Sequence, residues 1–162
     1  MASRNHSPHT STKAVPAFTL IEILVVVGLL VVIGAFTAAI GYDSYRVGAL
    51  HGEEHTLTSV LQKARAEALN NIGQSPHGVA IFPTTHPSSY VAFEGADYAS
   101  ADHALDEIID STYPVTIATP PAEVVFEQLS GESNYSGVIT ITDPVRGISA
   151  TIFLNSEGRI SK

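Results

Sequence analysis

Residues 18–40 form an apolar run in which Glu22 is the single ionisable side chain. A helix over the residues that follow Glu22 would be roughly 27 Å long, which is close to the thickness of the hydrocarbon core of a bilayer. We therefore predict a transmembrane segment over about 20–40. A carboxylate at mid-bilayer costs about 2.5 to 3.5 kcal/mol, so Glu22 needs a partner or an interfacial position.

After residue 42 the pattern changes from wholly apolar to amphipathic. An apolar stripe recurs at helical spacing and consists of Leu50, Leu57, Leu61, Ala64 and Ala68. This spacing predicts one long helix over 18–72, whose second half packs its stripe on a globular domain. We expect Glu53 and Glu54 to lie largely outside the stripe. The polar residues and glycine of 70–73 provide a stop signal.

The pattern over 73–162 is that of an antiparallel β domain. Short runs rich in β-branched and aromatic residues predict strands at 78–82, 90–94, 112–118, 124–129, 138–142, 149–154 and 158–160. Turn residues separate nearly all of them. We expect one or two helical turns or an ordered loop over 102–111. The predicted fold class is therefore α+β, with a long helix packed on an antiparallel sheet domain.

Composition narrows the possible functions. The chain has no cysteine, which excludes disulfides, thiolate chemistry and cysteine-based zinc sites. Eight Lys and Arg residues stand against 16 Asp and Glu residues, a net charge of −8. Arg4 and Lys13 are the only charged residues of 1–17, so the remainder carries 6 − 16 = −10. This balance argues against a broad nucleic-acid surface and suits a soluble domain outside the cell.

Residues 1–17 are predicted to be a cytoplasmic leader peptide. They are polar and carry two positive charges ahead of the apolar run, whereas Asp43 follows it. The positive-inside rule then places the amino terminus in the cytoplasm and the carboxyl-terminal domain outside. The competing interpretation is an ordinary secretory signal cleaved among the small residues of 35–39. The length of the apolar run and the presence of Glu22 argue against it.

The string Ala17-Phe18-Thr19-Leu20-Ile21-Glu22, after a basic leader and before an apolar run, resembles the processing site of type IV pilins and type II secretion pseudopilins. The resemblance implies that a membrane prepilin peptidase cleaves between Ala17 and Phe18 and then N-methylates Phe18. It also implies that Thr19 and Glu22 serve assembly. The family usually has glycine before the cut, where this chain has Ala17.

The order of elements, with a long helix followed by antiparallel strands, resembles the H-type pseudopilin or FimT-like minor branch of that family. The resemblance implies a structural subunit, single-pass in the cytoplasmic (inner) membrane and then part of an extracytoplasmic fibre. Its partners would be other pilin subunits, the prepilin peptidase and the membrane, with no cofactor and no enzymatic activity. A pilus-tip module that binds DNA or a surface ligand is the alternative.

The residues also support a charge argument for Glu22. Cleavage before Phe18 creates a positive amine one helical turn from this carboxylate. In a staggered bundle the amine of one subunit can meet Glu22 of its neighbour, which compensates two desolvated charges and sets the register. The simpler interpretation is a carboxylate that reaches back to the interface.

Two acidic or histidine-rich patterns suggest metal sites. Residues 51–55 match H-x-x-E-H, an inverted zinc-peptidase motif, but Gly52 is a poor helix residue and no third ligand is evident. A solvated polar face is the preferred interpretation.

One loop concentrates acidic residues, and three of them are calcium candidates by analogy with related pseudopilins: Asp97, Asp102 and Asp106. Their spacing matches no EF-hand, and a solvated acidic loop is preferred.

The carboxyl terminus carries the last candidate site. Arg159 and Lys162 are similar to the basic tail that some FimT-like pilins use on DNA, but two cations in an acidic chain make a weak polyanion site. A charged edge-strand ending is preferred, so we expect no nucleic-acid partner. The sequence contains no nucleophile elbow, phosphate loop or dinucleotide fingerprint, and we expect no catalytic residue.

Overall fold

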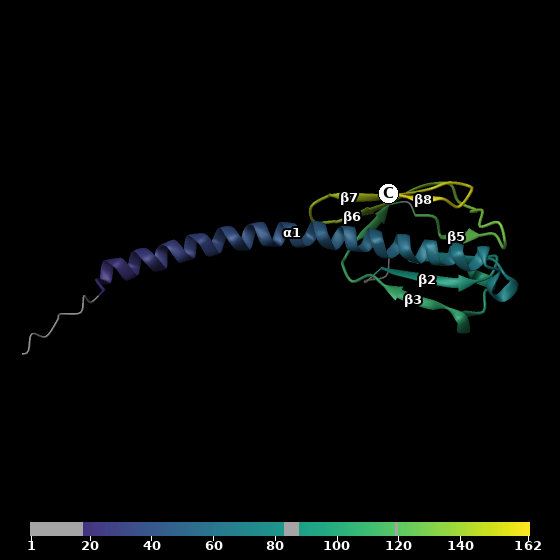
Figure 1. Ribbon diagram of the computed structural model, residues 1–162, viewed down its shortest axis with the longest axis horizontal. Helices are drawn as coiled ribbons and strands as arrows, with labels where there is room; N and C mark the ends of the chain where they lie inside the picture. The colour runs from purple at the N-terminus through teal and green to yellow at the C-terminus, as the bar shows by residue number, and fades with distance from the viewer. Residues whose placement is uncertain (1–17, 83–87, 119) are drawn as a thin grey trace, which may run out of the picture. The chain divides into compact units, whose positions relative to one another are not determined.

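The computed structural model describes residues 18–82, 88–118 and 120–162, without the side chains of 38–43 and 118 (Figure 1). The fold is α+β, as predicted. The chain divides into two compact units, Met1–Gly41 and Tyr42–Lys162. The helix α1 (Leu20–Leu69) contributes its first part to one unit and its second part to the other.

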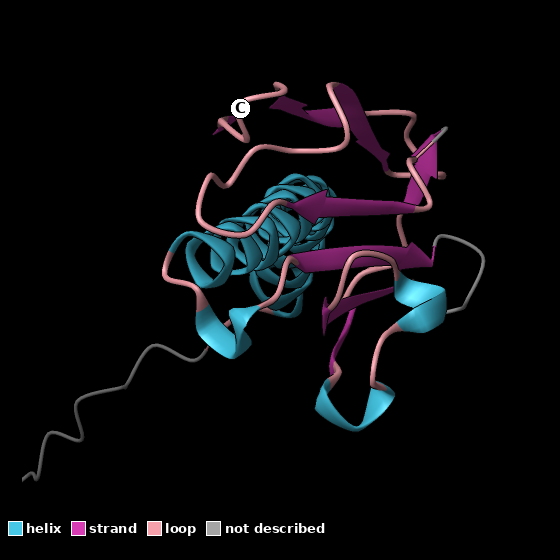
Figure 2. Ribbon diagram, turned by 90° about the vertical axis from the view of Figure 1, so that its right-hand side faces the viewer, coloured by secondary structure: helices cyan, strands magenta, loops and turns pink. Residues whose placement is uncertain are grey.

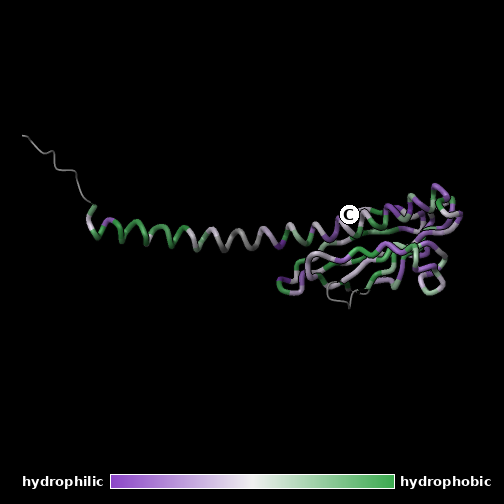
Figure 3. Tube along the Cα trace, turned by 90° about the horizontal axis from the view of Figure 1, so that it is seen from below, coloured by the Kyte–Doolittle hydropathy of each residue, from purple (hydrophilic) through white to green (hydrophobic). Residues whose placement is uncertain are grey.

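The first unit contains the apolar part of α1. The Oγ1 atom of Thr19 accepts a hydrogen bond from the backbone N–H of Glu22 at 3.3 Å, so Thr19 caps the helix. Every side chain of 18–37 is exposed, and the tube in Figure 3 shows how apolar this stretch is. Leu20–Thr37 has a mean hydropathy of 2.7. It is long and apolar enough to anchor the chain in a membrane or to direct its secretion.

The second unit contains two four-stranded antiparallel sheets. The strand order of the first sheet is β3 (Glu107–Asp110), β2 (Ser89–Glu94), β1 (His77–Phe82), β5 (Glu123–Phe126). The order of the second is β4 (Thr116–Ala118), β6 (Gly137–Thr142), β7 (Ser149–Leu154), β8 (Ile160–Ser161). The pairs Val79–Ala92 and Ile139–Ile152 illustrate the two registers.

The helix lies beside the strands of both sheets (Figure 2), and its apolar stripe packs against them. All five predicted stripe residues are buried, and Leu57, Leu61, Ala64 and Ala68 are completely inaccessible to solvent. They share one hydrophobic core with residues of both sheets, including Val79, Tyr90, Val124, Ile139 and Ile152. The prediction that the stripe packs on the domain is confirmed.

Some element boundaries differ from those predicted. The helix ends at Leu69, before the 3₁₀ turn η1 (Ile72–Gln74), because Asn71 already has a left-handed backbone with φ 56°. The segment 102–111 contains a 3₁₀ turn, η3 (His103–Leu105), but also the edge strand β3, which was not predicted. The predicted strand 112–118 begins only at Thr116, because the backbone before it bonds to a helix side chain described below.

The turn before β8 lies directly against α1. Gly158 has φ +72°, and a Cβ atom on it would lie 2.0 Å from the carbonyl oxygen of Gly131. Arg65 on the helix fastens the same region, since its Nε donates to the Gly131 oxygen at 3.3 Å and its Nη2 donates to the Glu157 oxygen at 3.1 Å. Only glycine fits this approach of two backbones.

The Gly158→Ala substitution should therefore lower the free energy of unfolding by about 2 to 4 kcal/mol, because it adds a backbone clash to the strain of a left-handed residue. Urea unfolding of the purified chain measures this. Gly147→Ala is the matched control, since Gly147 has a similar φ of +68° but open space around its Cβ position. The control should cost only about 1 to 2 kcal/mol. Equal losses would contradict the steric argument.

Candidate functional site

The amino end of α1 brings Phe18, Thr19 and Glu22 together at the start of an apolar surface. Phe18 is 75% exposed, and the Glu22 carboxylate forms no ion pair with any described residue. Ala17 and the rest of the predicted leader lie outside the described residues. Apart from Glu22 and the two threonines, the exposed residues of 18–37 are apolar or glycine, so this surface suits membrane anchoring or secretion.

A second polar cluster, which the sequence did not predict, lies where α1 meets the loops of the β domain. Glu53 is only 2% exposed. Its Oε1 accepts hydrogen bonds from the backbone N–H of Thr112 at 2.8 Å, from the Thr112 hydroxyl at 3.0 Å and from the N–H of Tyr113 at 3.1 Å. These donors offset part of the cost of burying the carboxylate, whose Oε2 is buried without a hydrogen-bond partner among the described residues. The expectation that Glu53 lies outside the stripe is wrong.

Asp143 is the second buried acid of this cluster. It has no solvent exposure, and the Tyr113 hydroxyl donates to its Oδ2 at 3.0 Å. Arg46 of α1 reaches both carboxylate oxygens, at 3.0 and 3.1 Å. The N–H groups of Val145 and Arg146 donate to Oδ1. We call Arg46, Glu53, Tyr113 and Asp143 the polar clamp, because together they join α1 to both sheets through the loops that follow β3 and β6.

The electrostatics of the polar clamp favour an ionised Asp143. Burial alone would raise the pKa of this carboxyl. The hydrogen bonds from the Val145 N–H, the Tyr113 hydroxyl and the Arg146 N–H, together with the Arg46 charge, outweigh burial and lower the pKa below its ordinary value. The carboxylate is saturated with donors, so the clamp is suited to holding elements in place.

The sequence contained one signal for Glu53. It lies three residues after Leu50 and four residues before Leu57, which places it on the buried face of the helix. Its charge nevertheless predicts exposure, because buried acids are rare without partners. The partners come from residues 112 and 113, far away in the chain, and only the tertiary fold reveals them.

The H-x-x-E-H pattern does not form a ligand set in the part of the chain that the structure describes, where no three His, Asp or Glu side chains converge. His51 Nδ1 lies 3.0 Å from Glu54 Oε2, whereas His55 bonds to Ser59 on the next turn. Both histidines are exposed, as expected of a polar face. Glu54 is only 6% exposed, so the expectation of an exposed carboxylate is wrong there too.

The calcium candidates lie apart and serve local hydrogen bonds. Asp97 accepts from the Ser100 hydroxyl and N–H, which lower its pKa, and caps the turn η2 (Tyr98–Ser100). Asp102 caps η3 through the N–H of Ala104. Asp106 Oδ2 lies 2.9 Å from Nδ1 of His103. This loop carries Tyr98, whose ring packs on Phe82, Phe93 and His103.

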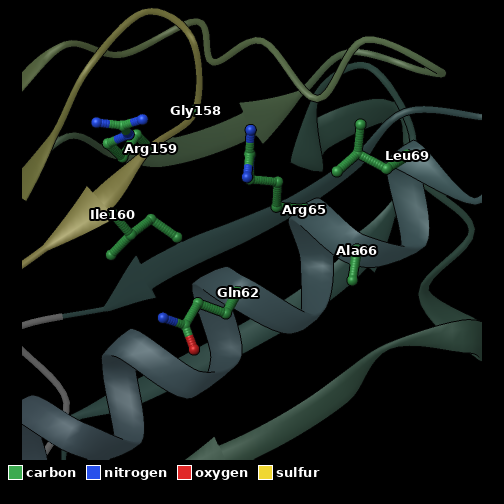
Figure 4. A pocket seen from close by; sticks show the side chains of 7 residues that line it. All are labelled: Gln62, Arg65, Ala66, Leu69, Gly158, Arg159 and Ile160. Carbon is green, nitrogen blue, oxygen red and sulfur yellow. The ribbon is translucent and has the colours of Figure 1, made fainter.

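The two basic residues of the carboxyl terminus have different surroundings. Lys162 Nζ lies 3.9 Å from Glu54 Oε1, beside the helix. Arg159 lies together with Arg65 at a groove between α1 and β8, about 290 Å³ in volume (Figure 4). The structure therefore separates Arg159 from Lys162 and pairs it with a helix residue that sequence reasoning did not select.

No protein-family model, curated protein or solved structure matches this chain. Two features stand out: the uncovered apolar surface that begins at Phe18, and the polar clamp that fixes the second part of α1 to the β domain. The first is a surface of the kind that anchors a chain in a membrane or directs its secretion, while the second holds the domain together.

The lowered pKa of Asp143 predicts acid sensitivity. The ionised form is favoured in the folded state, so its stabilising effect is present above the ordinary carboxyl pKa of 3.8 and is lost as the pH falls through the lower folded value. The free energy of unfolding should fall below about pH 4. Asp143→Asn should be less stable at pH 7 and lose less on acidification, whereas Asp110→Asn, on an exposed carboxyl, should behave like the unmodified chain. Parallel pH profiles for all three proteins would contradict this.

Tyr90 allows the opposite test at high pH. Its buried hydroxyl has no hydrogen-bond partner among the described residues. Burial, with a smaller effect of the Glu53 charge, raises the pKa of Tyr90 well above the ordinary 10.0. The neutral form is favoured in the folded state, so stability should fall as the pH rises above about 10. Tyr90→Phe should weaken this fall and change the stability at pH 7 by less than about 1 kcal/mol.

The matched control is Tyr113→Phe, because it also removes one tyrosine hydroxyl but breaks the bond to Asp143. Thermal unfolding at pH 7 should show Tyr113→Phe clearly destabilised and Tyr90→Phe nearly unchanged. If Tyr90→Phe were as damaging as the control, a partner for its hydroxyl would have to exist in solution.

Proposed function

We propose that this chain is a structural subunit of a type IV pilus-like or pseudopilus fibre. The observation that carries the proposal is the apolar first part of α1, which begins at a Thr19 cap and holds one carboxylate, Glu22. A helix of this kind is stable in lipid and can exchange lipid for the apolar helices of other subunits. The proposed precursor spans the cytoplasmic membrane with its amino end inside.

Processing would change the charge at the start of this helix. Cleavage between Ala17 and Phe18 leaves an amine one residue before the Thr19 cap. The N-terminal end of a helix has a partial positive charge, so this amine is poorly placed without a nearby anion. Glu22 is the one acid in the first turn of α1. Its side chain can neutralise the amine of its own chain in the membrane and that of a neighbour in the fibre.

The second unit supports the same role. The second part of α1 is fixed between two sheets by an apolar stripe and the polar clamp, so the β domain is held on the helix that carries the assembly surface. Both oxygens of Asp143 and the Oε1 atom of Glu53 accept hydrogen bonds within the domain, which suits a mechanical role for the clamp. We propose that the domain faces the outside while the helices bundle.

Mass spectrometry tests the processing step. When the full chain is produced with a prepilin peptidase, the mature protein should begin at Phe18 and carry one added methyl group on its amine. A mature terminus within 35–41 would identify a cleaved secretory signal and contradict the proposal. A chain that keeps residues 1–17 in the presence of an active peptidase would contradict it as well.

Glu22→Ala should leave cleavage intact but greatly reduce incorporation into fibres, because the buried amine of the neighbouring subunit would then lack its counter-charge. Quantitative immunoblotting of sheared fibres, relative to the membrane fraction, measures the effect. Glu132→Ala is the control, since it removes an exposed carboxylate of the β domain. Equal incorporation of both variants would refute the role assigned to Glu22.

A further inference from the structure

The groove beside β8 combines positive charge with apolar side chains. On one side lie residues of the outward face of α1, including Arg65 and Leu69, and on the other lie Arg159 and Ile160 (Figure 4). Leu69, in the last turn of the helix, is an apolar side chain that is 39% exposed. We call this surface the arginine groove; its full lining is Gln62, Arg65, Ala66, Leu69, Gly158, Arg159 and Ile160.

The two arginines of the groove have no acidic partner among the described residues. Arg65 donates to the carbonyl oxygens of Gly131 and Glu157, which carry no net charge. Arg159 forms no side-chain hydrogen bond or ion pair in the described part of the chain. Other cations of this acidic protein are neutralised, such as Lys63 by Glu107 and Glu67. An anionic group from outside the domain would complete the site.

The same domain presents an acidic and apolar surface elsewhere. We call this surface the acidic edge; it consists of β3, the edge strand of the first sheet, and of η3 before it. Leu105 and Ile108 are 62% and 67% exposed there, and Asp110 is exposed beside them. An exposed edge strand is a surface to which another chain can bind. In both ribbon views β3 and β8 lie on opposite sides of the second unit (Figures 1 and 2).

We propose that the arginine groove of one copy binds the acidic edge of a second copy of this chain. Asp110 would meet Arg159, while Ile108 and Leu105 would cover Leu69 and Ile160. Because the two surfaces differ and lie on opposite sides of the domain, the contact is heterologous and can repeat from copy to copy. It adds a domain-to-domain contact to the helix contact.

This contact rests on the proposed function in one respect. A groove of this size makes a small interface, so it needs copies that a membrane or fibre already holds at high local concentration. In return, the contact would fix the rotation of each domain relative to the next. A bundle of smooth apolar helices constrains that rotation only weakly.

The absence of native cysteine allows a direct cross-linking test. The full-length chain carrying Gln62→Cys and Ile108→Cys is reconstituted in phosphatidylethanolamine–phosphatidylglycerol vesicles and treated with a short bismaleimide. It should give a ladder of dimers, trimers and larger species, whereas a mixture of the two single variants should stop at dimers. The control pair is Gln62→Cys with Val145→Cys, since Val145 is similarly exposed at 71% but lies in the turn after β6. We expect about five- to tenfold less cross-linking from it.

A charge exchange separates a specific contact from general crowding. Arg159→Glu should reduce the ladder about fivefold, and Asp110→Lys in the same chain should restore it, because the pair is then reversed. The midpoint of thermal unfolding of each variant should be unchanged, since the side chains of Arg159 and Asp110 are exposed. A ladder that ignores these charges, or one no stronger than that of the control pair, overturns the inference.

A helix reporter distinguishes this failure from failure of the proposed function. Val26→Cys alone should form dimers if copies gather through the apolar part of α1. Dimers from Val26→Cys without the Gln62–Ile108 ladder would overturn the groove contact and leave the fibre proposal intact. The absence of both would count against both. Retardation of a short DNA duplex by the full chain without any ladder would assign the groove to a polyanion and overturn the contact.

Discussion

The β domain depends on one apolar stripe that two sheets share. Leu57, Leu61, Ala64 and Ala68 of α1 have no solvent exposure, and residues of both sheets close over them. Each sheet has four strands. The inner face of each sheet is covered partly by the other sheet and partly by α1. The helix is therefore the centre of the larger hydrophobic core, while a smaller cluster around Phe93 and Val125 includes no residue of α1. Removal of this helix would expose the inner faces of both sheets at once, so the order of the domain depends on the same element whose first part is apolar and exposed.

The polar clamp fixes the position of α1 on the two sheets. Apolar side chains tolerate small rotations and shifts of a helix, because dispersion contacts have little directionality. A buried carboxylate does not tolerate such shifts, because a shift that breaks its hydrogen bonds leaves an uncompensated charge in the interior. Glu53 accepts hydrogen bonds from backbone N–H groups of the loop after β3. Asp143 lies in the turn after β6 and accepts hydrogen bonds from the side chains of Arg46 and Tyr113. Two loops from different sheets thus fix the rotation of α1 about its own axis relative to the β domain.

The sequence predicted the periodic features and missed those created by tertiary contacts. The fold class, the apolar stripe and most strands follow from spacing alone. Strand β3 escaped because three of its four residues are exposed, so the alternation that reveals strands is absent. Glu53 and Glu54 looked solvated because nothing local shows their partners. The pairing of Arg65 with Arg159 arises only when the carboxyl-terminal turn folds back over the helix, at the approach that Gly158 permits.

The placement of Arg46 has a consequence for how the domain bears load. Arg46 hydrogen-bonds to Asp143 of the β domain near the start of the described side chains of the second unit, and Leu50, Glu53 and Leu57 contact the domain at successive turns. Tension that enters through the amino end of this segment and acts along the helix axis would strain these attachments in parallel, as a shear. Attachments loaded in parallel yield together, whereas attachments peeled one by one yield singly. Tension along the helix would therefore load several attachments of the domain at once.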